Sequence, residues 1–186
     1  MKKTARQYQE VIASCQDLFL RKAADYGTSW TILRMPSVTD QILIKAERIR
    51  SLQESGVNKV GESIEGEFIA IVNYCVIALI LWQNRSRDKA ELDVELADPA
   101  KLKTVYEAQV DHAYGTLEKK NHDYGEAWRK MRVSSMTDLI LMKIFRLKQI
   151  EDNDGSVRVS EGPDANYIDM LNYAVFCLIR MGEEKE

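Results

Sequence analysis

The residue types best suited to chemistry gather in one polar string in the second half of the chain. Lys120, Asp123 and Tyr124 precede Gly125, and Trp128 follows it. A carboxylate near an ammonium group can contact a metal ion or the phosphates of a ligand, and an indole can stack on a nucleobase. The structural alternatives are a turn-forming aspartate paired with a lysine and a tryptophan that fills the core. The string alone leaves both interpretations open.

Two cations follow on the next predicted helix, where Lys143 and Arg146 are three residues apart and share one side. Met142 and Phe145 help to make this helix apolar nearly all round, which predicts that it is largely buried. A buried cation needs an anionic partner, because an unpaired buried charge is strongly destabilising. That partner could be a ligand's phosphate or an acid of this chain. The candidate acids are Asp123, Glu161 and Asp169.

The same three acids could instead form a metal site. Carboxylate oxygens suit Mg²⁺, which could in turn hold phosphates. Asp169 lies one turn inside a predicted apolar helix, near Asn172, and Glu161 lies in the loop before it. A structural salt-bridge network is the alternative for these acids. A buried Asn172 amide must be hydrogen-bonded, so it either orients backbone or contacts a ligand.

The polar string occurs twice in the chain. A shift of 98 residues, from Lys22 to Lys120, superimposes the two occurrences without a gap, and further along the shift becomes 99. Helix periodicity alone does not require matching Lys, Asp, Trp and Arg, so we interpret the chain as a tandem duplication. Ala70 stands opposite Asp169, and we therefore expect the more complete site in the second copy. The first-copy counterparts are Lys22, Asp25, Tyr26, Gly27, Trp30, Lys45, Arg48, Asn73 and Tyr74.

Each copy is predicted to form three helices, with the Asp-Tyr-Gly segment in the loop after the first. Ser37 and Ser135 each precede an aspartate by three residues, which is the spacing of a capping box. Gly27 and Gly125 are expected to adopt a backbone shape that other side chains resist. Apolar residues recur at helical spacing over 4–22, from about 37 and over 68–82, and again from Asp98-Pro99, from about 135 and over 167–181.

No segment shows the alternation typical of a strand, so the predicted fold is all-α. A single three-helix unit with an apolar third helix buries little surface alone, and two units are expected to pack as one pseudo-twofold helical bundle. The expected divisions are a first repeat at 1–84, a charged linker at 85–97 and a second repeat at 98–186.

Composition narrows the functional classes. The net charge of -3 provides no general basic field, so direct nucleic-acid binding is not expected. The longest apolar stretch, 68–82, is shorter than the ~20 residues of a membrane-spanning helix and is expected to be a core helix. The three cysteines lack CxxC spacing and no signal segment is evident, which indicates a cytoplasmic protein without membrane association. A homodimer could still form.

A family resemblance rests on the second-copy string and on residues downstream of it. These are Lys143, Arg146, Glu161, Asp169, Asn172 and Tyr173. Together they resemble the nucleotide modification associated domain family, first type, over most of each copy, which implies a role around nucleotides. More distantly, the chain resembles all-α NTP pyrophosphohydrolases of the MazG and dimeric dUTPase type, which implies Mg²⁺ held by acidic pairs. It departs from that pattern, because its second helix offers Lys and Arg where those enzymes have Glu pairs.

Two hypotheses follow. The first is a protein that binds a nucleotide or another phosphate-bearing small molecule, and that could act as a Mg²⁺-dependent nucleoside triphosphate pyrophosphohydrolase. The second is a non-enzymatic binding or scaffold protein whose charges form buried networks. Under the first, Asp123, Glu161 and Asp169 are catalytic and metal-binding; Lys120, Lys143, Arg146, Lys22, Lys45 and Arg48 bind phosphate; and Trp128, Tyr124 and Asn172 contact the base.

Overall fold

The computed structural model describes residues 2–56, 61, 63–153 and 162–184 of the chain. Within these residues there are helices and turns but no strand, which confirms the all-α prediction. The first copy contributes α1 (Lys2–Tyr26), the short 3-10 helix η1 (Ser29–Ile32), α2 (Met35–Ser55) and α3 (Ile64–Gln83). After α4 (Lys89–Leu96), the second copy contributes α5 (Pro99–Tyr124), η2 (Ala127–Lys130), α6 (Val133–Asp152) and α7 (Pro163–Glu183).

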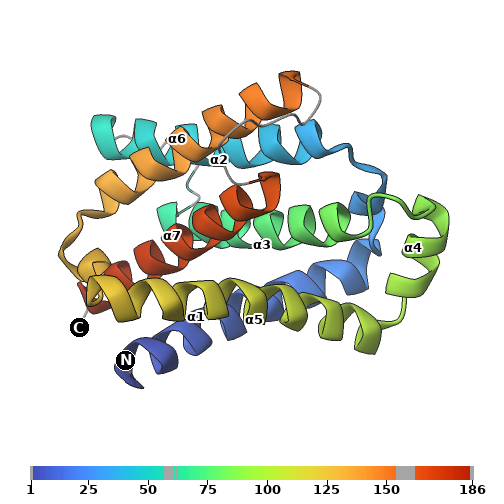
Figure 1. Cartoon of the computed structure of the whole chain (residues 1–186), viewed down its shortest axis with the longest axis horizontal. Coiled ribbons are helices and arrows are strands. Elements are labelled where there is room, and N and C mark those ends of the chain that lie inside the picture. The colour runs from blue at the N-terminus through green and yellow to red at the C-terminus, as the bar shows by residue number, and fades with distance from the viewer. Residues whose placement is uncertain (1, 57–60, 62, 154–161, 185–186) are drawn as a thin grey trace.

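Three layers of paired helices form one body (Figure 1). α3 and α7 pack against each other in the middle, α2 and α6 cover one side, and α1 and α5 cover the other. Each layer takes one helix from each copy, as a pseudo-twofold duplication requires. Because α3 and α7 are covered from both sides, apolar residues occupy nearly their whole circumference.

α3 is a core helix, although its length and composition would also allow it to cross a membrane. It is the one such helix among the residues described, and 61% of its most apolar stretch is buried against the rest of the protein. Its packing against both α7 and α2 explains its hydropathy. The prediction of a core helix over 68–82 is therefore confirmed.

The two Asp-Tyr-Gly segments end helices instead of forming loops, which corrects the predicted boundary. α1 and α5 continue through the tyrosines, so both aspartates lie in the last helical turn. Gly27 and Gly125 then have φ values of 68° and 60°, in the left-handed region that favours glycine. The expected glycine conformation is therefore confirmed, and it places a sharp helix end before each 3-10 turn.

The predicted capping boxes are wrong. α2 and α6 begin two residues before Ser37 and Ser135, so both serines lie inside a helix. Pro36 is compatible with the first turn of α2, but α6 begins at the equivalent residue without a proline, so the earlier start does not depend on it. Asp40 has a different partner: Lys148 of the second copy lies 2.5 Å from its carboxylate.

The predicted linker contains a helix that supports the first copy. Leu92 and Leu96 of α4 are buried. Asp93 accepts hydrogen bonds from the hydroxyls of Thr28, at 2.5 Å, and Thr31, at 3.2 Å. Residues 85–97 therefore hold η1 in place and are not a free connector.

Two core asparagines join the copies through crossed hydrogen bonds. Asn73 of α3 donates to a backbone carbonyl of α1 at 3.1 Å and accepts from the Tyr106 hydroxyl of α5 at 2.9 Å. Asn172 of α7 donates to a backbone carbonyl of α5 at 3.2 Å and accepts from the Tyr8 hydroxyl of α1 at 2.9 Å. Each amide thus binds the first helix of its own copy and a tyrosine of the other copy.

A second crossed contact differs between the copies. The Thr39 hydroxyl of α2 donates to the Glu151 carboxylate of α6 at 2.6 Å, beside the Tyr167 hydroxyl. At the equivalent place Gln53 of α2 donates to the Thr137 hydroxyl of α6 at 3.1 Å. Burial raises the pKa of Glu151 more than these hydroxyl hydrogen bonds lower it. One copy therefore contributes a neutral amide where the other contributes a half-buried acid.

Candidate functional site

Asp169 binds two lysines in the second copy. Its carboxylate oxygens lie 2.6 Å from Lys120 Nζ and 2.6 Å from Lys143 Nζ. The side chains of Asp169 and Lys143 are only 11% and 12% exposed. Burial alone would raise the pKa of Asp169, but the hydrogen bonds and charges of the two lysines outweigh it and hold the pKa below its ordinary value. Asp169 is therefore a weak general base and a strong structural anion.

This arrangement does not fit a Mg²⁺ site. Each oxygen of Asp169 already accepts from an ammonium group, and that positive charge opposes a metal cation at the same atoms. The exposed Asp123 is engaged separately, 3.1 Å from His122 Nδ1, and Glu161 lies outside the residues described. Over the described parts of the chain, no three His, Cys, Asp or Glu side chains form a group that could hold a metal ion. The predicted catalytic and metal-binding roles of Asp123 and Asp169 do not suit this geometry.

Arg146 does not join Lys143 beside Asp169. Its side chain is exposed on α6, as are the neighbouring Met142 and Phe145, at 45% and 54%. The prediction that this helix is largely buried holds for one side of it only, because Met142 and Phe145 lie on its exposed face. Of the two cations predicted to bind phosphate there, only Lys143 lies inside the protein.

Trp128 is a core residue, which corrects its predicted role. Its side chain is buried, its ring stacks on Phe176 with centroids 4.2 Å apart, and the Arg129 guanidinium lies 4.4 Å from the ring centroid. Tyr124 points the other way, being 74% exposed. Asn172 uses its amide for the crossed hydrogen bonds between the copies. The three predicted base-binding residues therefore do not assemble into one site.

The first copy has its own buried acid, Glu67, which the sequence analysis missed. Its Oε2 lies 3.2 Å from Lys45 Nζ, and its Oε1 accepts a hydrogen bond from Arg48. Glu67 is almost fully buried, so it is the anionic partner that the two cations of α2 require. The available signal was a glutamate in the first turn of an otherwise apolar helix.

The buried acid shifts by one helical turn between the copies. Glu67 of α3 corresponds to Asn166 of α7, whereas Asp169 of α7 corresponds to Ala70 of α3. In both copies an acid of the third helix therefore pairs with a cation of the second helix. The shift leaves a small side chain at Ala70, next to the first-copy lysine that corresponds to Lys120.

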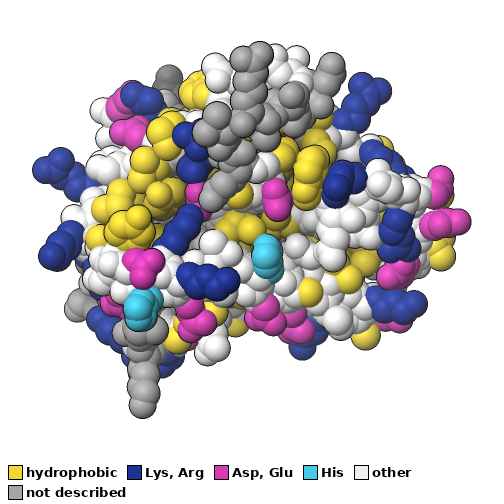
Figure 2. All heavy atoms as spheres, viewed as in Figure 1, with side chains coloured by type: hydrophobic (Ala, Val, Ile, Leu, Met, Phe, Trp, Pro, Cys, Tyr) yellow, Lys and Arg dark blue, Asp and Glu magenta, His cyan; other side chains and the backbone are white. Residues whose placement is uncertain are grey.

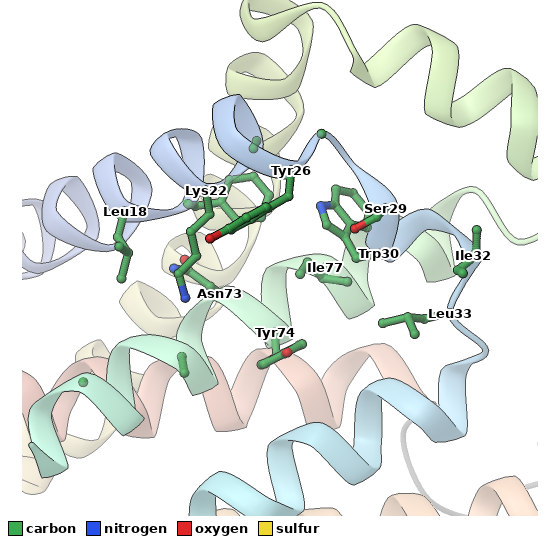
Figure 3. A pocket seen from close by; sticks show the side chains of 15 residues that line it. Leu18, Lys22, Tyr26, Ser29, Trp30, Ile32, Leu33, Asn73, Tyr74 and Ile77 are labelled. Carbon is green, nitrogen blue, oxygen red and sulfur yellow. The ribbon is translucent and has the colours of Figure 1, made fainter. Parts of the chain in front are cut away.

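A cavity of about 450 Å³ opens at this place, between the end of α1, η1 and α3 (Figure 3). Lys22 and Tyr26 extend from α1, Trp30 lies on η1, and Asn73 and Tyr74 come from α3. In the close-up the Lys22 side chain points from α1 toward α3, and the Tyr26 ring lies between Lys22 and Trp30. The site thus combines aromatic rings with one ammonium group, and we call it the first-copy cavity.

Two positions of this cavity carry larger side chains in the second copy. Ala70 lines the first-copy cavity, whereas Asp169 stands at the same position in α7. Ile77 also lines the cavity, whereas its counterpart Phe176 stacks on Trp128. The geometry therefore moves the candidate site from the second copy, where the sequence placed it, to the first.

Histidine and cysteine are not part of this site. His112 and His122 lie exposed on α5, and Figure 2 shows them as two separate patches on one face of the molecule. Cys15, Cys75 and Cys177 are buried and form no disulfide, and burial raises the pKa of each thiol. The cavity can therefore offer aromatic stacking, an ammonium group and phenol hydroxyls.

Comparison with known families connects this geometry to a sequence pattern. A family model described as nucleotide modification associated domain 1 matches residues 22–81 and 120–181, well over half of the chain. Each matched segment begins at the lysine of the polar string and includes the 3-10 turn and the second helix of its copy. No curated protein and no solved structure gives a significant match.

Proposed function

Because the chain belongs to the nucleotide modification associated domain 1 family, in two tandem copies, we propose that it binds a nucleotide in the first-copy cavity. The observation that carries the proposal is the lining of this cavity, which lies within the first family-matched segment apart from part of α1. A volume of about 450 Å³ falls in the range of small-molecule sites.

The aromatic side chains suit a nucleobase. Trp30 is partly exposed and lines the cavity, unlike the buried Trp128. Tyr26 stands exposed at the opening, and Phe19 and Tyr74 complete the aromatic wall. A planar base can stack on such rings, and Lys22 supplies positive charge for a phosphate.

We assign binding to this site and no hydrolytic step. The two acids that are buried among the described residues, Glu67 and Asp169, are both paired with cations. These ion pairs join the second and third helices within each copy. We therefore interpret these ion pairs as structural, and we assign nucleotide binding to the open cavity.

The setting that we propose is cytoplasmic, with small molecules and not nucleic acid as partners. The net charge is -3, and basic and acidic side chains alternate over the face shown in Figure 2. A nucleic-acid surface would be expected to gather its cations along one groove or face.

The test is a thermal-shift and calorimetric screen of the whole chain against canonical and modified nucleotides. Ile77→Phe, which introduces the second-copy side chain, should fill the cavity and weaken binding at least about tenfold. Ile77→Leu conserves volume and should bind within about twofold of the parent chain. A screen in which no nucleotide binds, or in which Ile77→Phe binds as well as Ile77→Leu, would overturn the proposal.

A further inference from the structure

We infer that Asp169 occupies, in the second copy, the position at which a ligand places its phosphate in the first copy. The ligand class is a nucleoside monophosphate, bound beside Lys22 and Ala70 without a metal ion. This inference rests on the proposed function and specifies it: Lys120 of the second copy pairs with Asp169 of the chain, whereas Lys22 of the first copy pairs with the phosphate of a ligand.

The geometry of the second copy defines the anion position. One oxygen of Asp169 accepts from Lys120 at 2.6 Å, and the other accepts from Lys143 at 2.6 Å. The first copy repeats both lysines, as Lys22 and Lys45, but has Ala70 in place of the acid. The difference therefore removes the carboxylate beside Lys22, while Lys45 pairs with Glu67 instead.

The first-copy cavity includes the vacated position. Lys22 and Ala70 both line it, so the space beside Ala70 is open where a longer side chain would stand. Figure 3 shows the Lys22 ammonium group pointing toward α3, the helix that carries Ala70 and Asn73. The Tyr74 phenol also lines this cavity and can donate a hydrogen bond to a phosphate oxygen.

Charge indicates which anion fits. Among the residues described, Lys22 forms no ion pair with an acid, whereas Lys45 already faces Glu67. A phosphate monoester carries nearly two negative charges at neutral pH and accepts several hydrogen bonds. A triphosphate is usually bound with Mg²⁺, which needs carboxylates that are not already paired with cations. The site therefore suits one phosphate group and a base.

The experiment compares nucleoside monophosphates with their parent nucleosides by calorimetry, in EDTA and in Mg²⁺. We expect each monophosphate that binds to do so at least about tenfold more tightly than its nucleoside, since the phosphate adds charge-assisted hydrogen bonds that the nucleoside lacks. Replacing EDTA with Mg²⁺ should change the affinity by less than about twofold.

Ala70→Asp is the decisive variant, because it gives the first copy the acid of the second. It should abolish the preference for monophosphate over nucleoside. Ala70→Asn has the same size without the charge and should keep most of that preference. Asp169→Asn, in the other copy, should leave first-copy binding unchanged.

The outcomes separate the two proposals. Equal binding of nucleosides and monophosphates, or equal effects of Ala70→Asp and Ala70→Asn, would overturn this inference while leaving nucleotide binding in place. A strict Mg²⁺ requirement would also overturn it. If neither nucleosides nor nucleotides bind the parent chain, both the inference and the proposed function fail.

Discussion

The two copies have the same arrangement of helices but different side chains between them. In the second copy, Asp169 neutralises two lysines, and Phe176 stacks on Trp128. In the first copy, Ala70 and Ile77 stand at the equivalent positions and line a cavity. The helices and their cations are kept, so the difference lies in what fills the space between them. A duplicated scaffold can thus keep the same helices while one half pairs its polar-string lysine with an internal acid and the other half leaves a cavity beside the equivalent lysine.

The largest expected effect comes from breaking the closed half. Asp169→Ala should lower the free energy of unfolding by about 3 kcal/mol, because it leaves the buried Lys143 without its anion. Urea denaturation measures this loss. Adding Lys143→Met to the variant should restore part of the stability. A loss below about 1 kcal/mol would show that the pair is not the buried anchor described above.

Opening the second copy should create a second site. The double variant Asp169→Ala with Phe176→Ile gives α7 the two side chains that line the first-copy cavity. Calorimetric stoichiometry should rise from one to two nucleotides per chain, with affinities within about tenfold of each other, equivalent to 1.4 kcal/mol. The control is the same double variant carrying Ile77→Phe, which should return to one. A stoichiometry that stays at one in the folded double variant contradicts the comparison.

A smaller effect on stability is expected at the position where the first copy has Gln53 and the second copy has Glu151. The raised pKa of Glu151 means that its protonated form favours the folded state, so its contribution is present below the ordinary pKa of 4.5 and is lost as pH rises through the folded pKa. Glu151→Gln should therefore stabilise the protein at neutral pH, with no gain below pH 4.5. Melting temperatures from pH 4 to 8 test this. A gain that does not grow with pH contradicts the assignment.

The smallest effect distinguishes the two lysines of the polar strings. Lys120→Ala should destabilise the protein by about 1 kcal/mol, because it removes a hydrogen bond to a buried carboxylate. Lys22→Ala should change the stability by less than about 0.5 kcal/mol, since Lys22 is exposed. Equal losses in denaturant unfolding would indicate that Lys22 has a structural anion after all.

The fold could be predicted from the sequence, because apolar periodicity and a repeated string of polar residues both constrain it. The glycines illustrate this: an Asp-Tyr-Gly after a helical pattern predicts a left-handed residue, and Gly27 and Gly125 have that conformation. The helix ends were less predictable. The capping spacing at Ser37 and Ser135 predicted a start at the serines, whereas both helices begin two residues earlier.

The site was predictable only in part. Lys143 needed an anion and Asp169 was among the candidates, so that pairing could be anticipated from charge and burial alone. The direction of each side chain could not. Arg146 is three residues from Lys143 yet lies exposed, and whether Trp30 or Trp128 faces a cavity depends on the opposing side chains of α3 and α7. From the sequence, Ala70 predicts a less complete site in the first copy, whereas in the structure Ala70 lines the first-copy cavity.

The crossed asparagine–tyrosine hydrogen bonds bear on how such a chain can diverge. Tyr106 serves Asn73 and Tyr8 serves Asn172, so neither half can complete its own interior alone. A single-copy chain would need a second molecule to provide the tyrosine hydroxyl, so the contact would depend on the protein concentration. Covalent fusion makes the contact intramolecular, with the effective concentration, about millimolar, that is typical of tethered partners. In a homodimer both halves have the same sequence, whereas in the fused chain the side chains of one half can change while those of the other half stay the same.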